Sequence, residues 1–166
     1  RPSVVYSVDD NFTTNFMTLL NRLPIFPIFK NPKFMPIYVQ DLTEVIYQVI
    51  SKEIGATTIE CVGPETITLK EMLQKLLKLI RKKKFLLPLP SLVSKLIAKT
   101  FQILPNPIIT EDQLKLLEYD NISTGKFKNN FDIGIPSTHT FEEEVEKYCY
   151  MWREAGQFSK KWQILF

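Results

Sequence analysis

The chain has 166 residues, of which 45% are hydrophobic and 12% are aromatic, a composition typical of a globular protein. Its 21 basic and 18 acidic residues leave a net charge of +3 at pH 7, which is too balanced to indicate a nucleic-acid-binding surface. No run of about 18 apolar residues occurs, so no transmembrane helix is expected.

The first part of the chain predicts a strand, a helix and a loop. Residues 1–6 are apolar enough for a strand buried in a sheet, and residues 11–20 follow as a helix. The two prolines in residues 23–29 prevent that helix from continuing, because proline lacks the backbone donor and disfavours helix at the residue before it. We therefore expect an apolar loop there, packed against a neighbour or at the mouth of a pocket.

Residues 34–46 predict a short strand that runs directly into a helix, and the rest of the chain is organised around this stretch. Residues 37–39 alternate as a strand does. Asp41 can cap the helix that follows, and Glu44 stands three residues later, at the position that completes a capping box.

A second strand and helix are predicted after it. Residues 57–62 form the strand, and Thr68 with Glu71 forms a capping box at the start of the helix. Arg81 and the three lysines after it end this helix. Its apolar stripe consists of Leu69, Met72, Leu73, Leu76, Leu77 and Ile80.

The remaining chain is predicted to be mostly helical. A stiff connector at residues 86–90 leads into a helix over residues 91–104, and a short helix capped by Thr110 and Gln113 follows. After a polar loop over residues 120–130, a last helix starts at Thr140 and Glu143 and reaches Ala155, where Gly156 stops it. The apolar tail at residues 162–166 is expected to pack on this chain or on a partner.

The sequence carries no recognisable active-site motif. Its five glycines are never closer than eight residues, so it has no glycine-rich phosphate loop, and no Tyr-x-x-x-Lys occurs. Metal-ligand spacing and a nucleophile elbow are missing as well. His139, the one histidine, lies beside a predicted helix start, where we expect a structural or surface role. Cys61 and Cys149 are expected to be reduced and structural, in a cytosol-like or matrix-like compartment.

Five motifs occur in an order that resembles one protein family. Together they cover most of the chain, which resembles the carboxyl-terminal half of atypical extended short-chain dehydrogenase/reductases, most closely the NAD(P)H-binding accessory subunits of respiratory complex I and their bacterial relatives. The motifs are Arg1-Pro2-Ser3-Val4-Val5-Tyr6, Ile37-Tyr38-Val39-Gln40-Asp41-Leu42, Gly63-Pro64-Glu65-x-x-Thr68-Leu69-x-Glu71, Leu87-Pro88-Leu89-Pro90 and Thr110-x-Asp112-Gln113-x-x-x-Leu117-x-x-Asp120-Asn121.

The resemblance implies an α/β fold. Residues 1–166 would form a single fragment, with the final strands of a Rossmann-type sheet and a mostly helical carboxyl-terminal region, while the nucleotide-binding half lies upstream of Arg1. It also implies NADPH or NADH as the cofactor, held mainly upstream, with Pro2, Ser3 and Val4 as contacts at the nicotinamide end. The alternative is that these three residues only fill a buried strand. No residue is assigned to catalysis or to metal binding.

Two functions of different class follow from the resemblance. The first is a non-catalytic NAD(P)H-binding accessory or assembly subunit that joins complex I subunits, in the bacterial cytoplasm or the mitochondrial matrix at the inner membrane. The second is an NAD(P)-dependent epimerase/dehydratase or reductase for a small metabolite or nucleotide sugar, inactive as this fragment. Nucleotide-sugar epimerases commonly carry Arg-Asp where this chain has Phe34 and Met35. An apolar pair cannot clamp phosphates as a guanidinium does, which favours the first function.

Two groups of cations flank the proline-rich connector. One consists of Arg81, Lys82, Lys83 and Lys84, and the other of Lys95 and Lys99. One interpretation is that these cations are solvated and that the first group complements the carboxyl terminus of a helix. The other is that both groups form a surface that peripherally contacts anionic lipid or an acidic partner.

Overall fold

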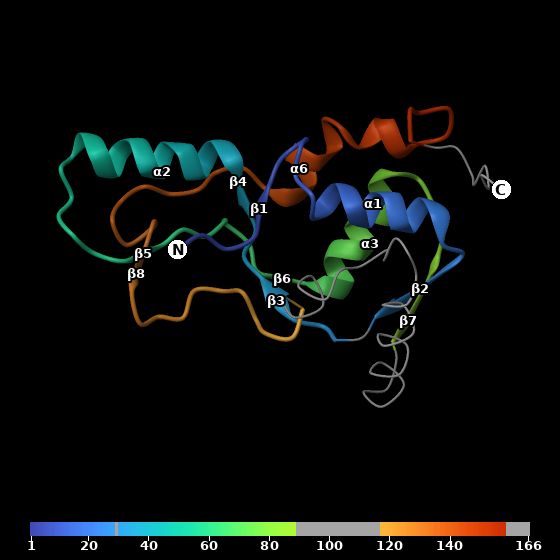
Figure 1. The fold of residues 1–166 in the computed structure, drawn as a ribbon, viewed down its shortest axis with the longest axis horizontal. Helices are drawn as coiled ribbons and strands as arrows, with labels where there is room; N and C mark the ends of the chain where they lie inside the picture. Colours follow the sequence, from blue (N-terminus) through green and yellow to red (C-terminus); the bar gives the residue numbers. More distant parts are fainter. Residues whose placement is uncertain (29, 89–116, 159–166) are drawn as a thin grey trace, which may run out of the picture.

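The computed structural model of the protein describes residues 1–28, 30–88 and 117–158. Within these ranges the fold is mixed α/β, and helices alternate with short strands that pair two by two (Figure 1). The elements are β1 (Val5–Tyr6), α1 (Thr13–Arg22), β2 (Ile25–Ile28), β3 (Lys33–Phe34), β4 (Ile37–Tyr38), α2 (Val39–Ser51), β5 (Ile59–Glu60), β6 (Ile67–Thr68), α3 (Leu69–Leu79), β7 (Phe85–Pro88), β8 (Lys128–Asn129), α6 (Phe141–Glu146) and the 3-10 helix η1 (Cys149–Trp152).

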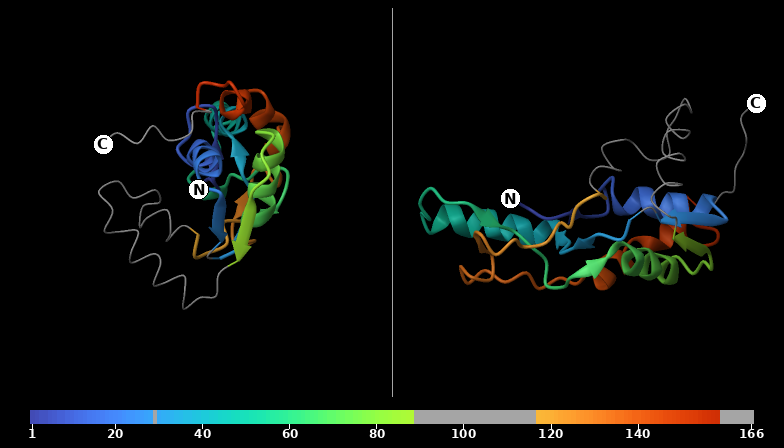
Figure 2. Two further views of the ribbon diagram at one scale, coloured as in Figure 1. Left: turned by 90° about the vertical axis from the view of Figure 1, so that its right-hand side faces the viewer. Right: turned by 90° about the horizontal axis from the view of Figure 1, so that it is seen from below.

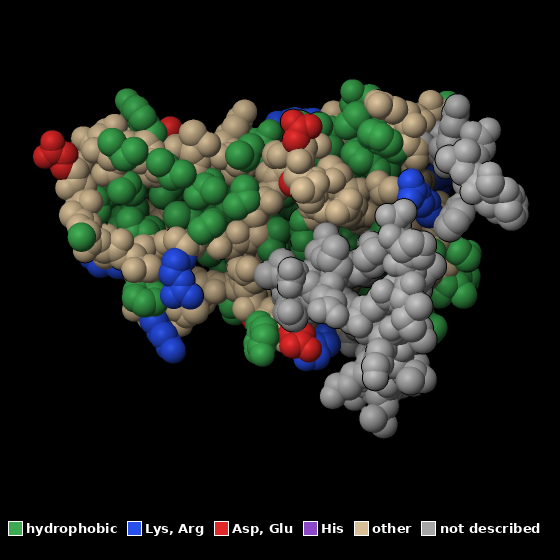
Figure 3. Space-filling model, viewed as in Figure 1, with side chains coloured by type: hydrophobic (Ala, Val, Ile, Leu, Met, Phe, Trp, Pro, Cys, Tyr) green, Lys and Arg blue, Asp and Glu red, His purple; other side chains and the backbone are tan. Residues whose placement is uncertain are grey.

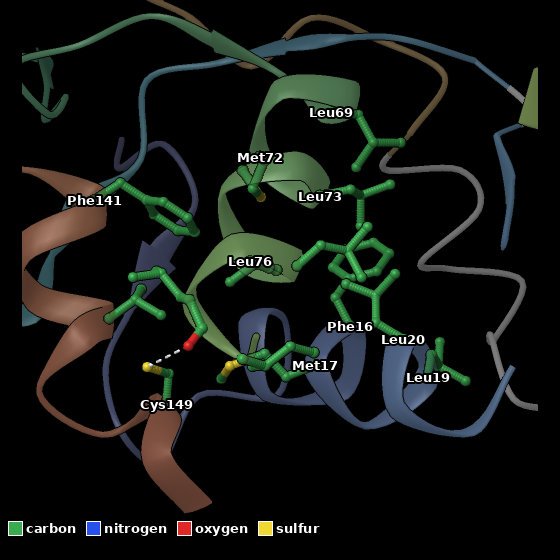
Figure 4. Close-up of a cluster of buried hydrophobic side chains, with 14 of the residues drawn as sticks. Phe16, Met17, Leu19, Leu20, Leu69, Met72, Leu73, Leu76, Phe141 and Cys149 are labelled. Atoms are coloured by element: carbon green, nitrogen blue, oxygen red, sulfur yellow. Dashed lines mark hydrogen bonds between the residues drawn. The ribbon is translucent and has the colours of Figure 1, made fainter. Parts of the chain in front are cut away.

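Helix α3 forms the centre of the larger hydrophobic core. The predicted capping box is confirmed: the Glu71 N–H donates to Thr68 Oγ1 (3.2 Å), and the Thr68 N–H donates to Glu71 Oε2 (2.7 Å). The predicted apolar stripe is buried, and each such side chain contributes roughly 2 kcal/mol. Figure 4 shows α3 between the side chains of α1, such as Phe16 and Leu20, and Phe141 of α6.

A smaller core lies under α2, at the other end of the molecule from β2 and β7 (Figures 1 and 2). Helix α2 buries only one narrow face, on which Asp41 and Val45 lie. The buried apolar members of this core are Ile37, Val45, Cys61 and Ile135.

Three parallel strand pairs join segments that are far apart in the sequence. β1 pairs with β4, β2 with β7 and β5 with β8, whereas β3 and β6 are antiparallel. Parallel strands need a crossover connection, which between β1 and β4 contains α1. The structure therefore confirms the predicted α/β class.

Gly63 packs directly against the backbone that leads into β4. Its N–H donates to the Met35 carbonyl at 3.1 Å. A Cβ atom at this position would lie 1.7 Å from the carbonyl oxygen of Pro36, so only glycine fits here.

Two predictions for the first thirty residues were wrong in detail. The strand expected over residues 1–6 covers only Val5–Tyr6, although Pro2 forms a separate bridge with Cys61. The loop expected at residues 23–29 contains a strand, β2, because proline is tolerated in a strand that pairs on one side only, and β7 provides that partner.

The capping box predicted for α2 was also wrong. The helix begins at Val39 with Tyr38 as the N-cap residue, and Asp41 instead accepts hydrogen bonds from the backbone of Thr138 and His139. Glu44 Oε1 accepts from Gln48 Nε2 one turn further along. Asp41 therefore has its partners far away in the sequence, where a local pattern gives no sign of them.

The last helix starts where predicted but ends early. Thr140 is the N-cap residue of α6, and its hydroxyl donates to Glu143 Oε2 at 2.6 Å. The helix was predicted to reach Ala155, which instead has a φ of 65°. Helix α6 ends at Glu146, and η1 follows it. The chain after η1 contacts the end of α3, where Arg153 Nε donates to the Leu79 carbonyl at 2.9 Å.

Several predictions lie outside the described residues. These are the helix at residues 91–104 with Lys95 and Lys99, the short helix at Thr110, and the tail at residues 162–166. Among the residues that are described, no helix is both long and apolar enough to cross a bilayer. Cys61 and Cys149 are free and buried, as predicted.

Candidate functional site

A polar pocket of about 240 Å³ lies where the start of the chain meets two distant segments. In Figure 1 the amino terminus lies beside β5 and β8. Concave surfaces assembled from several segments, with convergent polar groups, are typical ligand sites. The lining residues are Arg1, Pro2, Ser3, Glu60, Val62, Asp120, Asn121, Ile122 and Thr124.

Two of the three predicted cofactor contacts line this pocket. The Ser3 N–H donates to the Cys61 carbonyl, and its hydroxyl donates to the Asn121 carbonyl, both at 2.9 Å. Pro2 is held beside it by the bridge to Cys61. Val4 does not line the pocket; its side chain packs against the larger core. That these residues contact a cofactor stays a prediction.

Glu60 is the buried charge of the pocket. Its carboxylate accepts three hydrogen bonds, from Ser123 Oγ (2.8 Å), the Thr124 N–H (2.8 Å) and Thr124 Oγ1 (2.6 Å). The bond from the Thr124 hydroxyl is the main cause that lowers the pKa of Glu60, with smaller help from Ser123, the Thr124 N–H and the charge of Arg1. Glu60 is therefore an anion at neutral pH, and it fixes the loop that closes the pocket.

Another part of the lining is fixed by the backbone of Asn121. Its N–H donates to the Lys33 carbonyl at 2.7 Å, and its carbonyl accepts from the Met35 N–H at 3.1 Å as well as from Ser3. Asp120 Oδ1 accepts from the Lys33 N–H at 2.8 Å. The strand β3 thus holds this part of the lining in place before any ligand arrives, which reduces the entropy lost on binding.

The pocket offers binding groups rather than an obvious reaction centre. The Arg1 guanidinium lies 5.4 Å from the centre of the Phe127 ring, at the rim. The described residues contain no cluster of three or more His, Cys, Asp and Glu side chains that would hold a metal ion. The lining includes neither a histidine nor a cysteine.

A second polar contact links α2 to the segment before α6. His139 Nδ1 lies 2.7 Å from Asp41 Oδ1, and the backbone N–H groups of Thr138 and His139 donate to Asp41 Oδ2 at 3.2 and 3.1 Å. The His139 ring lies 5.2 Å from the Tyr38 ring, centre to centre. The structural role expected for His139 agrees with this arrangement.

Two other tyrosines, Tyr6 and Tyr148, are buried in the larger core. Tyr6 is fully buried, and its hydroxyl has no hydrogen-bond partner among the described residues. Burial, with a smaller contribution from the nearby Glu144, raises the pKa of Tyr6 far above its ordinary value. Burial likewise raises the pKa of Tyr148, whose hydroxyl lies 3.2 Å from Thr13 Oγ1. Burial therefore disfavours the ionised form of both tyrosines.

The sequence predicted no pocket role for most of the lining, and the main polar residues it missed are Glu60, Asn121 and Thr124. A glutamate inside the apolar run Ile59-Glu60-Cys61-Val62 was the available signal, since a charge within a buried strand indicates a specific partner. Asp120 and Asn121 belong to one of the five family motifs, but no pocket role was predicted for them.

No protein-family model and no curated protein sequence matches this chain. Its structure is similar to the crystal structure of UDP-N-acetylglucosamine 4-epimerase from Bacillus cereus, with a TM-score of 0.57 and 13% sequence identity. The similarity covers 93% of this chain and 45% of that epimerase, so the chain spans less than half of its length. At this identity the likeness shows the fold alone: a mixed α/β chain with the architecture of part of that epimerase.

Proposed function

We propose that this chain is the ligand-side part of an NAD(P)-binding protein of the short-chain dehydrogenase/reductase type. On this proposal its pocket receives the nicotinamide end of NADPH or NADH, and the main cofactor site lies outside the 166 residues. The observation that carries the proposal is that Pro2 and Ser3 line one polar pocket together with Glu60 and Asn121. The fold likeness to an epimerase supports the same class.

The size of the pocket supports a small fragment rather than a whole dinucleotide. Its volume of about 240 Å³ is below the roughly 300–1,000 Å³ of ordinary ligand sites. A nicotinamide group has only about nine non-hydrogen atoms, so it can supply only a small part of the binding free energy of a whole dinucleotide.

The surroundings of Phe34 bear on the substrate. Phe34 is 1% exposed, and its ring lies 5.8 Å from that of Phe12. The position where related epimerases commonly carry a phosphate-binding arginine is thus part of the hydrophobic core. If the complete protein is an enzyme, we propose an epimerase/dehydratase or reductase that holds its substrate without a phosphate clamp at this position.

The second candidate is the non-catalytic accessory or assembly subunit of respiratory complex I. The observation that favours it is the burial of Phe34, which stands where nucleotide-sugar epimerases commonly carry a phosphate-binding arginine. This candidate rests on the family resemblance, and it predicts that the tagged protein co-purifies with NADH dehydrogenase subunits from detergent-solubilised respiratory membranes.

The pocket proposal is tested by NMR titration of the ¹⁵N-labelled chain with NADPH and, separately, with UDP-N-acetylglucosamine. We expect NADPH at millimolar concentration to shift the amide signals of Ser3, Asn121 and Thr124, without a saturable micromolar site. Asn121→Trp, which keeps the backbone bonds of this residue but places a large side chain in the pocket, should abolish the shifts of Ser3 and Thr124. Gln74→Ala, a change outside this pocket, should leave them unchanged. Shifts that avoid the pocket would refute the proposal.

A further inference from the structure

Strands β2 and β7 form a two-stranded parallel ribbon with one buried and one exposed apolar face. Phe26 and Ile28 are buried in the larger core. On the other face Ile25, Phe85 and Leu87 are 51, 80 and 48% exposed. The register places Ile25 opposite Phe85 and Pro27 opposite Leu87, so these four side chains form one continuous apolar ladder.

An exposed apolar ladder on a parallel ribbon is unusual, because parallel strands are normally covered on both faces. The two segments lie about sixty residues apart in the sequence, and only their pairing brings their apolar side chains together. Such a patch is typical of a surface that meets another apolar phase.

Cations gather at the amino ends of both strands. Arg22 ends α1 shortly before β2. Lys82, Lys83 and Lys84 immediately precede β7 and line a hollow of about 480 Å³ together with Gln74, Leu77, Lys78 and Phe85. Lys78 Nζ donates to Glu142 Oε1 at 2.7 Å, so one of these cations is already partly neutralised. Lysine side chains and Phe85, a member of the ladder, therefore line the same hollow.

We propose that this ribbon face, consisting of Ile25, Pro27, Phe85 and Leu87 with the cations Arg81 to Lys84, docks on the surface of an anionic lipid bilayer. The lysines would meet lipid phosphates, and Phe85 and Leu87 would enter the interfacial region. The proposal is independent of the cofactor pocket, which uses none of these residues.

Charge and area both favour a bilayer over a protein partner. The cations lie on one side of a short apolar strip, which suits the boundary between headgroups and acyl chains. A stable protein interface needs about 800 Å² per partner and roughly 20 residues or more, whereas the apolar ladder consists of four side chains. A bilayer has no such minimum, because each cation and each inserted side chain adds to the partitioning separately.

The first experiment measures co-sedimentation of the full chain with vesicles of phosphatidylcholine and phosphatidylglycerol. Lys82→Gln, Lys83→Gln and Lys84→Gln together should lower the partition coefficient about 100-fold, at about fivefold per charge. The matched control changes Lys52, Lys70 and Lys126 to Gln; these lysines are exposed on other parts of the chain. This control has the same net charge and should change partitioning less than about fivefold, because charges beyond a Debye length of about 10 Å are screened at 0.1 M salt.

A second experiment reports on the ladder itself. Cys61 and Cys149 are buried, so a Phe85→Cys variant can be labelled selectively with an environment-sensitive NBD fluorophore. We expect its emission to shift to the blue on addition of anionic vesicles and not with phosphatidylcholine alone. The matched control is Ile50→Cys, at an apolar side chain that is 71% exposed. It belongs to α2, which lies at the opposite end of the molecule from β2 and β7 (Figure 1). The emission of a label at this position should not shift.

Four outcomes would overturn the proposal. The first is an equal loss of binding in the two lysine variants, and the second is a blue shift at both labelled positions. The third is a label at position 85 that is already blue-shifted without vesicles, which would mean that another segment of the chain covers the ribbon face. The fourth is that the unmodified chain does not bind anionic vesicles at low salt.

Discussion

Oδ1 of Asp41 lies 2.7 Å from Nδ1 of His139, 98 residues further along the chain. The same carboxylate accepts the backbone N–H groups of Thr138 and His139. Because Asp41 is only 7% exposed, these donors have no easy replacement in water. This one side chain therefore fastens the start of α2 to the segment that leads into α6.

Asp41→Ala should lower the free energy of unfolding by about 2–4 kcal/mol, because three buried or partly buried donors lose a charged acceptor. Urea denaturation followed by circular dichroism measures the change. Glu44→Ala is the matched control on the same helix and should cost less than about 0.5 kcal/mol, since Glu44 bonds only to the exposed Gln48 side chain. Equal losses in the two variants would instead support the local capping box that the sequence predicted.

Gly63→Ala should prevent folding or cost more than about 3 kcal/mol, because the new Cβ would lie 1.7 Å from the Pro36 carbonyl oxygen. Gly55→Ala provides the comparison, because no atom lies within 4 Å of a Cβ built there. We expect it to be neutral or stabilising by up to about 1 kcal/mol. Thermal unfolding of both variants decides the matter, and a Gly63→Ala protein as stable as the unmodified chain would contradict the packing described here.

The hydrogen bonds to Glu60 predict a pH-dependent part of the stability. Its pKa is lowered in the folded chain from an ordinary value of 4.5, so this stabilisation is fully present above that pH and disappears as the pH falls toward the folded pKa. Glu60→Gln should therefore cost about 1–3 kcal/mol at pH 7, and this cost should decrease as the pH falls below 4.5. Urea titrations at pH 7 and at several pH values below 4.5 test this. A difference that stays constant with pH would show that the charge of Glu60 is not what stabilises the loop.

The exposed stripe on α2 predicts weak self-association. Ile46, Tyr47 and Ile50 are 52, 61 and 71% exposed, and Figure 3 shows hydrophobic side chains gathered over this helix. Ile46→Lys with Ile50→Lys should shift the chain toward monomer in sedimentation velocity experiments, because the stripe then loses most of its apolar area. Tyr150→Lys, at a 59% exposed aromatic elsewhere, should have no effect. An unmodified chain that is monomeric at high concentration would contradict this prediction.

The candidate site was predictable only in part. The family motif at the start of the chain identified Pro2 and Ser3, and both line the pocket, while Val4 of the same motif packs into the core. Glu60 and Asn121 had no predicted role. Glu60 lines the pocket because its neighbour Cys61 forms a bridge with Pro2, about sixty residues away in the sequence. Asn121 lines it because its carbonyl accepts from the Ser3 hydroxyl, 118 residues away.

Elements with local signals could be predicted from the spacing of residues alone. The Thr68–Glu71 capping box and the apolar stripe of α3 depend on spacings of three and four residues, which a helix brings together whatever the rest of the chain does. Tertiary structure decided everything that depends on a distant partner. Asp41 bonds to residues near position 139 rather than capping its own helix. A proline-containing loop becomes a strand because β7 pairs with it. The last helix ends at Glu146, and Arg153 in the chain beyond it binds the end of α3. In each case the local preference is worth about 1 kcal/mol or less, and a few tertiary contacts exceed it.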